Sequence, residues 1–272
     1  PEKIAGVRVY RTPALSYQHV TFNCRHPILS DVRVRRALAW ATHREDIVEA
    51  AFEGVAQPAR AGMHPNRPGY NPLAEELAVH DVQRAEALLE EAGWSDSDGD
   101  GIRDRGGRPL RLEINTGAGM TQRERTQAIL QQQWRRVGVD LVIQNHDFGV
   151  VIEKLVSGDF ETALFGWGQS PDPAGIEVVY GTGFAPPNGQ NMGRFSNARF
   201  DELAARGTRV ADHRERIEIY REIQEILLRN VPAIPLVWAV ELDPMTERLQ
   251  NFHPNPTDAG DTWNVHEWRL SP

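Results

Sequence analysis

The sequence predicts an α/β fold, because strand-like and helix-like segments alternate through its centre. Three short apolar segments are typical of buried strands: residues 110–115, 139–145 and 161–168. Residues 121–137 and 150–156 lie between them as predicted helices, each followed by a glycine that ends it. This order predicts parallel strands joined by right-handed crossovers. Ligands bind beyond the carboxyl ends of such strands, so we expect the functional site there.

Capping patterns mark where two of the helices begin. Thr121 is followed three residues later by Glu124, which is the capping-box spacing at the start of a helix. Asp212 and Glu215 repeat this spacing at the start of a second predicted helix, over residues 212–230. Both helices therefore have a start signal that does not depend on their apolar pattern.

The chain before the central unit is predicted to be a strand, a helix and a loop. Residues 6–24 are extended, and a long helix runs from Ser30 or Asp31 to about Phe52 with one apolar face. Residues 58–72 contain too many prolines and glycines for regular structure. This part of the chain therefore adds one strand and one long helix.

The rest of the chain adds further helices and one buried strand. Residues 81–92 and 197–206 are predicted helices, and residues 233–240 are apolar enough for a buried strand. Residues 180–196 form a surface segment rich in glycine and proline, and residues 248–272 run through turns.

Composition excludes several classes of function. The chain of 272 residues is 40% hydrophobic and 25% charged, which is typical of a globular protein. Its net charge of −8 argues against nucleic acid as a partner, because phosphates require a cationic surface. Cys24 is the single cysteine, so no internal disulfide forms. Lysine occurs only at Lys3 and Lys154, which leaves little room for Schiff-base chemistry or a Walker loop.

An acidic turn is a weak candidate for a calcium site. Asp96, Asp98 and Asp100 stand at positions one, three and five of a calcium loop, and Gly101 is its turn glycine. The bidentate glutamate expected at position twelve is replaced by Gly107. We therefore favour a solvated turn and expect no strong calcium binding.

A glycine-containing loop suggests a nucleotide-dependent enzyme as an alternative function. Gly117-Ala118-Gly119 lies between a strand and a helix, and Asp147 ends the next strand, as in a dinucleotide fingerprint. Gln122 occupies the position of the third glycine, and its side chain would obstruct close packing of helix and strand. The match is therefore incomplete.

The loop after the third central strand is the main candidate site. Trp167 ends this strand, where an indole forms either a ligand platform or part of the core, and the sequence does not decide between them. Polar side chains follow it, and the glycine-rich segment further on adds two asparagines. The predicted ligand-binding residues are Trp167, Gln169, Ser170, Asp172, Asn188 and Asn191.

Short motifs recur in a set order along the chain and indicate a family. They are Phe22-Asn23, Pro27, Asp31-Val32-Arg33-Val34-Arg35-Arg36-Ala37-Leu38, Asp46-Ile47-Val48, Glu91-Ala92-Gly93-Trp94, Gly158-Asp159-Phe160, Gly166-Trp167-Gly168, Arg216 and Tyr220. In this order they resemble the C-terminal half of the extracytoplasmic solute-binding proteins of ABC transporters. The family is that of the dipeptide-, oligopeptide- and nickel-binding proteins (family 5).

The resemblance implies a fold and a division into domains. The fold would be a lobe of the type II periplasmic-binding protein, with a parallel or mixed sheet flanked by helices. Residues 23–240 would form the C-terminal ligand-binding lobe, and residues 1–22 and 241–272 would belong to the first lobe or the hinge. We expect residues 6–22 and 241–272 to lie together, away from the sheet of residues 110–168. The N-terminal lobe would be a missing part of the same parent chain.

The resemblance also implies a function. The chain would be the substrate-binding component of an ABC importer, which captures a solute between two lobes and delivers it to the membrane permease. Its location would be periplasmic or extracytoplasmic, membrane-associated through the transporter. We expect no enzymatic activity, no cofactor, no metal and no nucleic acid.

Two departures from the family pattern bear on the solute. Peptide binders place an aspartate three residues after the tryptophan, where this chain has Ser170, and no arginine stands in residues 116–120. These positions hold the peptide's ends in dipeptide binders. The expected solute is therefore a peptide, a modified peptide or an oligosaccharide rather than a plain dipeptide.

Overall fold

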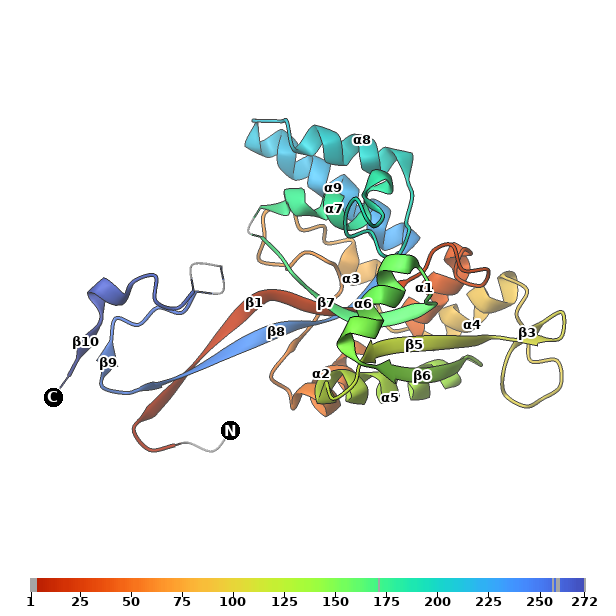
Figure 1. Cartoon of the computed structure of the whole chain (residues 1–272), viewed down its shortest axis with the longest axis horizontal. Coiled ribbons are helices and arrows are strands. Elements are labelled where there is room, and N and C mark those ends of the chain that lie inside the picture. Colours follow the sequence, from red (N-terminus) through yellow and green to blue (C-terminus); the bar gives the residue numbers. More distant parts are fainter. Residues whose placement is uncertain (1–3, 171, 256, 258–259, 272) are drawn as a thin grey trace.

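A computed structural model describes residues 4–170, 172–255, 257 and 260–271. Its central feature, within these residues, is a mixed sheet with the strand order β2-β8-β1-β7-β5-β6 (Figure 1). The strands are β1 (Val7–Phe22), β2 (Gln57–Pro58), β5 (Arg111–Gly117), β6 (Asp140–His146), β7 (Thr162–Gly168) and β8 (Ala233–Thr246). β5 pairs in parallel with β6 and β7, whereas β1 pairs antiparallel with β7 and β8. The predicted parallel unit is confirmed.

Helices surround this sheet. The α-helices are α1 (Val32–Ala41), α2 (Arg44–Phe52), α3 (Ala74–Leu77), α4 (Val82–Glu91), α5 (Thr121–Arg135), α6 (Phe148–Ser157), α7 (Ile176–Tyr180), α8 (Ala198–Gly207) and α9 (His213–Asn230). The 3₁₀ helices are η1 (Pro173–Gly175), η2 (Thr182–Phe184) and η3 (Val265–Glu267). Two small antiparallel pairs join β3 (Asp104–Arg105) to β4 (Arg108–Pro109) and β9 (Leu249–Gln250) to β10 (Arg269–Leu270). No helix in the described part of the chain is long and apolar enough to span a bilayer.

The larger core lies on the face of the sheet that carries Leu112, Ile114 and Leu164. Side chains of α1, α2, α4 and α5 cover this face, and Trp134 of α5 is fully buried among them. Truncation of such a buried aromatic side chain costs about 3–5 kcal/mol of stability. The stability of this core therefore depends on α5, the helix between β5 and β6.

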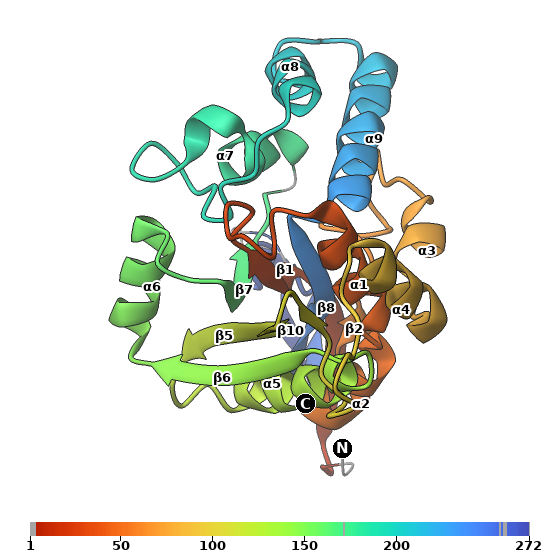
Figure 2. The ribbon, with the colours of Figure 1, turned by 90° about the vertical axis from the view of Figure 1, so that its right-hand side faces the viewer.

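The opposite face carries a smaller core beneath α6. Neighbouring residues of a strand point to opposite faces, so Ala163 of β7 points away from Leu164. Ala163 packs with Val151 and Leu155 of α6. Figure 2 shows α5 and α6 on different sides of β5 and β6. Trp167 lies on the same face as Ala163, because the two residues stand four positions apart along the strand.

The prediction of one long helix over residues 30–52 is wrong, because the structure has two helices, α1 and α2, that meet at Thr42 and His43. Thr42 is extended, and its Oγ1 accepts a hydrogen bond from Trp134 Nε1 at 3.0 Å. The His43 N–H donates to Gln133 Oε1 at 3.1 Å, and Gln133 Nε2 donates to the His43 carbonyl at 3.0 Å. Tertiary hydrogen bonds from α5 replace helical ones at this break.

Helix starts follow the capping rules in most places. In each of four N-caps a side-chain oxygen accepts a backbone N–H of the first turn: Asp31, Asp81, Asn197 and Asp212. The capping box predicted at Thr121 is wrong, since Thr121 is the first residue of α5. The N-cap is Met120, whose side chain makes no capping hydrogen bond. Glu124 Oε1 accepts instead from the Gly119 N–H at 2.8 Å.

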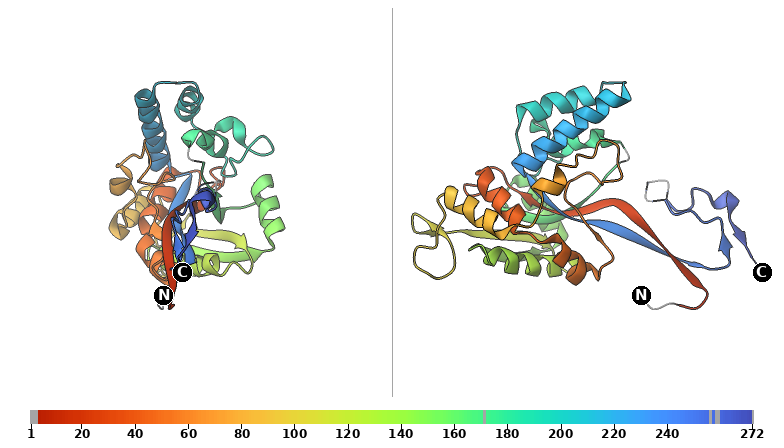
Figure 3. Two further views of the ribbon diagram at one scale, coloured as in Figure 1. Left: turned by 90° about the vertical axis from the view of Figure 1, so that its left-hand side faces the viewer. Right: turned by 180° about the vertical axis from the view of Figure 1, so that it is seen from behind.

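β1 and β8 continue past the edge of β7 as a two-stranded arm. β1 pairs with β7 as far as Ser16 and Gly168, and residues 7–13 then pair with residues 240–246. Figures 1 and 3 show this arm projecting from the helices, with the C-terminal segment at its tip. β8 therefore extends beyond the predicted strand of residues 233–240.

The arm corrects part of one expectation. Residues 16–22 do not lie away from the sheet of residues 110–168, because they pair with β7 as a strand of that sheet. Residues 7–12 do pair with residues 241–246, as expected. The assignment of both segments to another lobe stays a prediction.

Candidate ligand-binding site

The loop that follows β7 is held in place by β1. Trp167 pairs with Tyr17 in the register of the two strands, so their side chains share one face of the sheet. One step further, the Gln169 N–H donates to the Leu15 carbonyl at 2.7 Å. The candidate residues therefore stand on a strand end rather than on an unsupported loop.

Trp167 contacts other rings along part of its indole. Its ring meets that of Phe165 edge-on, with 5.5 Å between the centroids, and it packs against the buried group of Tyr17, Ala59 and Trp238. Tyr17 and Trp238 lie with their centroids 4.9 Å apart. Trp167 itself is only half-buried. The indole is thus supported on one side and available on the other.

A cavity of about 310 Å³ opens beside Trp167, at the carboxyl end of β7. The loop after β7, α7 and the segment that carries Gly62 surround it. Its lining residues are Tyr17, Gly62, Met63, Arg67, Trp167, Gly168, Gln169, Ser170, Asp172, Pro173, Gly175, Ile176, Val178, Val179, Tyr180 and Gln190. The strand-end position agrees with the place that parallel-sheet topology predicts for a ligand.

Gln169 closes one wall of this cavity. Its Nε2 donates a hydrogen bond to the Gly62 carbonyl, which ties the loop after β7 to the irregular segment after β2. A Cβ atom on Gly62 would lie 3.3 Å from the Tyr17 hydroxyl oxygen, closer than an ordinary contact. A larger residue at this position would therefore crowd the Tyr17 hydroxyl.

Asp172 lies at the mouth of the cavity and is already paired. Arg216 of α9 donates from Nη2 to Oδ1 at 2.7 Å and from Nη1 to Oδ2 at 3.0 Å. The Ala174 N–H donates to Oδ1 at 2.8 Å, so Asp172 also caps η1. These hydrogen bonds, that from Arg216 first, lower the pKa of the Asp172 carboxyl. The carboxylate is therefore neutralised by the chain itself.

A second cavity of about 350 Å³ adjoins the first and shares Met63, Arg67, Asp172 and Pro173 with it. Arg67 Nη2 donates to the Ser170 carbonyl at 2.8 Å. Burial lowers the pKa of Arg67, and the negative charge of Asp172 partly opposes this shift. The mouth of the site therefore holds two arginines around one aspartate.

The structure brings Trp167, Gln169, Ser170 and Asp172 together around the first cavity, which neither asparagine lines. Asn191 lines a small adjoining cavity that also has Trp167 in its wall. Asn191 is buried, and its Nδ2 donates to the carbonyls of Gly181 at 2.9 Å and Phe195 at 2.8 Å. Asn188 is exposed and is not among the residues that line either cavity. Gln190, which sequence analysis did not select, lines the first cavity instead.

Several lining residues escaped the sequence analysis. Tyr17 had an available signal, because it lies in the predicted extended stretch and alternates with His19 on one face. Arg67 had none, since it lies in a segment whose prolines and glycines predict only irregular structure. Arg216 reaches Asp172 from a helix that is distant in sequence, which no local pattern reveals.

The sequence and the fold match a known family. Residues 2–183 match the family described as "Bacterial extracellular solute-binding proteins, family 5 Middle". The chain belongs to this family. Its members bind solutes, and the sheet with flanking helices is that of type II periplasmic-binding proteins.

Several curated relatives of this family-5 chain are named peptide-binding proteins. Di/tripeptide-binding protein 3 of Pseudomonas aeruginosa is 26% identical over 257 residues, which are 94% of this chain and 46% of the relative. Oligopeptide-binding protein AppA of Bacillus subtilis is 25% identical over 273 residues, 99% of this chain and 50% of the relative. The chain thus spans about half the length of the curated relatives it matches.

Solved structures show the same fold. Bacillus subtilis AppA in complex with a nonapeptide superposes with a TM-score of 0.83 at 25% identity, over 100% of this chain and 54% of AppA. NikZ of Campylobacter jejuni in complex with Ni(L-His) gives a TM-score of 0.82 at 23% identity, over 98% of this chain and 54% of NikZ. The latter likeness concerns the fold alone.

The alternative of a nucleotide-dependent enzyme finds no support in this family-5 chain. In the loop of Gly117-Ala118-Gly119, the Gly119 N–H donates to Glu124 Oε1 at 2.8 Å. A phosphate at a helix N-terminus needs such N–H groups, and the Glu124 carboxylate would repel it. The Glu124 carboxylate therefore already accepts the hydrogen bond that a phosphate would need from the Gly119 N–H.

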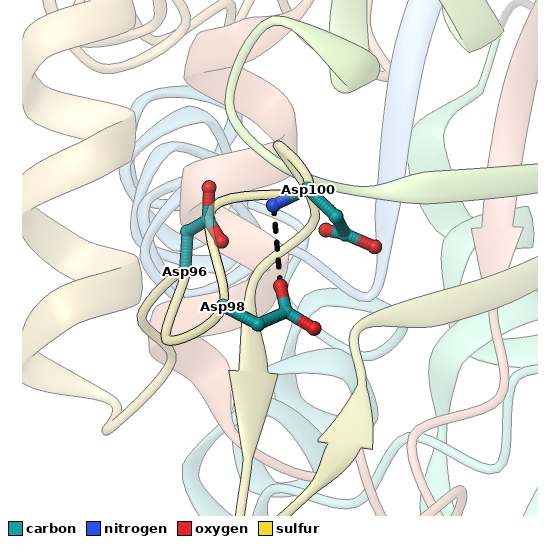
Figure 4. A group of neighbouring side chains, drawn as sticks. All are labelled: Asp96, Asp98 and Asp100. Carbon is teal, nitrogen blue, oxygen red and sulfur yellow. Dashed lines mark hydrogen bonds between the residues drawn. The ribbon is translucent and has the colours of Figure 1, made fainter.

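The acidic turn after α4 brings its aspartates together. Oxygen atoms of Asp96, Asp98 and Asp100 all lie within 4.8 Å of one another, and the three residues are exposed (Figure 4). Asp98 Oδ1 accepts the Asp100 N–H at 3.2 Å, and Asp96 accepts from Gly99 and Gly101 at 2.8 and 3.0 Å. These hydrogen bonds stabilise the turn without requiring a cation.

Proposed function

We propose that this chain is the ligand-capturing lobe of a solute-binding protein that delivers a small solute to the permease of an ABC importer. The observation that carries the proposal is the cavity beside Trp167. An aromatic wall, backbone groups and a few charged side chains surround it at a strand end, as in ligand pockets generally. The names of the relatives, which bind di-, tri- and oligopeptides, support a peptide-like solute.

The charges at the mouth narrow the class of solute. The ammonium group of a peptide needs a carboxylate, yet the Asp172 carboxylate already accepts three hydrogen bonds from Arg216 and Ala174. Ser170 presents a hydroxyl at the position of the family's usual aspartate. These features favour a modified peptide, an oligopeptide held along its backbone, or an oligosaccharide over a free dipeptide.

Capture would proceed by closure of two lobes over the solute. Closure is driven only by a higher affinity of the closed state for the solute, so the solute must contact both lobes. The arm supports a contribution to another lobe, because Val9 and Leu242 on it are 43% and 41% exposed. We therefore assign residues 1–15 and 241–272 to the hinge or the first lobe, whereas residues 16–22 belong to the sheet of this lobe. The N-terminal lobe would belong to the same parent chain.

The protein would act outside the cytoplasm, in the periplasm or an equivalent extracytoplasmic space. It would meet the membrane through the permease of its transporter. We assign it no enzymatic activity, because none of the cavity's residues forms a pairing of nucleophile and base among the described contacts.

A melting-temperature screen tests this proposal. Ligands that bind only the folded state raise the melting temperature, by an amount that grows with the logarithm of ligand concentration over Kd. We expect a rise with an oligopeptide, a modified peptide or an oligosaccharide, and none with NAD or ATP. A rise with a nucleotide and with none of the peptides or sugars would contradict the proposal.

A further inference from the structure

A small, deep cavity lies against the floor of the candidate site. Its volume is about 20 Å³, and it shares Trp167, Val179, Tyr180 and Gln190 with the larger cavity. A space of this size accommodates one small polar group, since a water molecule needs about 10–15 Å³ by the same measure. His19, Thr21 and Phe165 contribute to its wall.

The sheet register aims His19 into this space. His19 pairs with Phe165 across the two strands, two residues along each strand from the pair of Tyr17 and Trp167. Side chains alternate along a strand, so Tyr17 and His19 lie on the same face as Phe165 and Trp167. The rings of Tyr17 and His19 lie with their centroids 5.2 Å apart. His19 is therefore placed beneath the aromatic wall of the cleft.

The imidazole of His19 has a polar atom without a protein partner. His19 is 1% exposed, and its Nδ1 is a buried atom with no hydrogen bond among the described residues. The Asn191 side chain, which also lines this cavity, is by contrast paired. A buried nitrogen without a partner is unfavourable, so a group that enters the small cavity and bonds to Nδ1 is stabilised there.

The chemistry of this group follows from the surroundings of His19. Burial, together with the positive charge of Arg123, lowers the pKa of His19 to about 3, so the ring is neutral near pH 7. A neutral imidazole has one donor and one acceptor nitrogen. A charged group would lose its hydration in so small and enclosed a space. A hydroxyl satisfies either nitrogen without carrying charge.

We propose that His19 is a specificity-determining residue, which hydrogen-bonds through Nδ1 to an uncharged hydroxyl of the solute in the small cavity under Trp167. The proposal rests on the proposed function, since it assumes that the cleft binds a solute. The hydroxyl belongs to a tyrosine, serine or threonine of a peptide, or to a sugar. The prediction concerns preference for the hydroxyl, not the presence of binding.

Matched probes test this preference in the intact protein. Calorimetry compares the peptides Ala-Tyr-Ala and Ala-Phe-Ala, and Ala-Ser-Ala and Ala-Ala-Ala, with cellotriose as the sugar arm. For at least one pair, or for the sugar, we expect the affinity to depend on His19. The hydroxyl should raise the affinity of the probe roughly five- to tenfold, the scale of one hydrogen bond. His19→Phe should abolish this gain, and His19→Gln should keep part of it.

Control variants separate this role from a structural one. His64 is another buried histidine, in ring contact with Trp238 and outside the lining of both cavities, so His64→Phe should leave the hydroxyl preference unchanged. Melting temperatures show which variants fold, and His19→Gln decides the outcome if His19→Phe does not. A hydroxyl preference that survives undiminished in folded His19→Phe, or in folded His19→Gln where His19→Phe does not fold, overturns the inference. Absence of binding of every probe by the unaltered chain overturns the proposed function, and this inference with it.

Discussion

Arg216 of α9 donates hydrogen bonds from both of its terminal guanidinium nitrogens to the Asp172 carboxylate. The Nη2–Oδ1 distance is 2.7 Å and the Nη1–Oδ2 distance is 3.0 Å. The pair joins the loop after β7 to a helix that lies far from it in sequence. Its geometry is bidentate, the arrangement in which arginine binds a carboxylate best. The negative charge at the mouth of the cleft is therefore cancelled before any solute arrives.

Replacement of Arg216 should change the charge preference of the cleft. In Arg216→Gln the Asp172 carboxylate loses its cation, so Ala-Lys-Ala should gain about three- to fivefold over Ala-Ala-Ala, the scale of one charge interaction at the surface. Calorimetric titration measures this ratio. Arg199→Gln removes a similar pair, with Glu222 on α9, and should leave the ratio unchanged. An equal ratio in both variants would contradict a role for Arg216 in the cleft.

The same pair predicts a dependence on pH. The folded-state pKa of Asp172 is below its unfolded value, so the pairing contributes stability above the unfolded pKa and loses it as pH falls through the folded pKa. The melting-temperature difference between the unaltered chain and Arg216→Gln should therefore be small at neutral pH, because the pair is exposed, and vanish in acid. Thermal denaturation as a function of pH measures it. A difference that grows on acidification would show that the pair does not act in this way.

Arg44 should be a main contributor to stability near the site. It is 3% exposed, and its guanidinium donates to the carbonyls of Ala59, Pro235 and Ala78 at 2.8, 2.7 and 2.9 Å. Arg44→Met leaves these three carbonyls without their donor, which should lower the free energy of unfolding by roughly 3 kcal/mol. Urea denaturation measures the loss.

An exposed arginine provides the control for Arg44. Arg125 lies 3.7 Å from Glu53 in an exposed ion pair, so Arg125→Met should cost less than about 1 kcal/mol. Equal losses in the two variants would show that the three carbonyls find other donors when Arg44 is removed.

Calcium binding by the acidic turn should be weak. Asp96 and Asp98 already accept backbone N–H groups, and the sequence has Gly107 in place of the bidentate glutamate. Calorimetry with calcium should therefore show no sub-micromolar affinity. A sub-micromolar affinity that disappears in Asp98→Ala would overturn this prediction.

Local sequence signals predicted the elements that short-range physics determines. The alternation of strands and helices over residues 110–168 and the cap at Asp212 are confirmed, because each depends on neighbours within a few residues. The break at Thr42 was not predictable in this way. It depends on Gln133 and Trp134, which lie about ninety residues further along the chain.

The same distinction between local and distant determinants applies to the residues of the candidate site. Sequence analysis found four residues of the cavity because they stand close together at the end of one strand: Trp167, Gln169, Ser170 and Asp172. Asn191 was selected for its residue type, but its side chain bonds to the backbone around it. Residues that reach the cleft from other elements were missed, because their position depends on the packing of α7, α9 and the segment after β2.

The affinity of Trp167→Ala is the measurement that tests the account most directly. The indole offers a broad apolar surface to the cavity and is only partly buried by the chain itself, so its removal should weaken solute binding by roughly 1–3 kcal/mol, about five- to 150-fold. Calorimetry with the peptide or sugar that raises the melting temperature most measures this change, and urea denaturation measures stability. Trp134→Phe, in the buried core, is the control and should lower stability without affecting affinity. The account predicts a large loss of affinity and a small loss of stability in Trp167→Ala. Unchanged affinity together with a stability loss of about 3–5 kcal/mol would contradict it and make Trp167 a core residue.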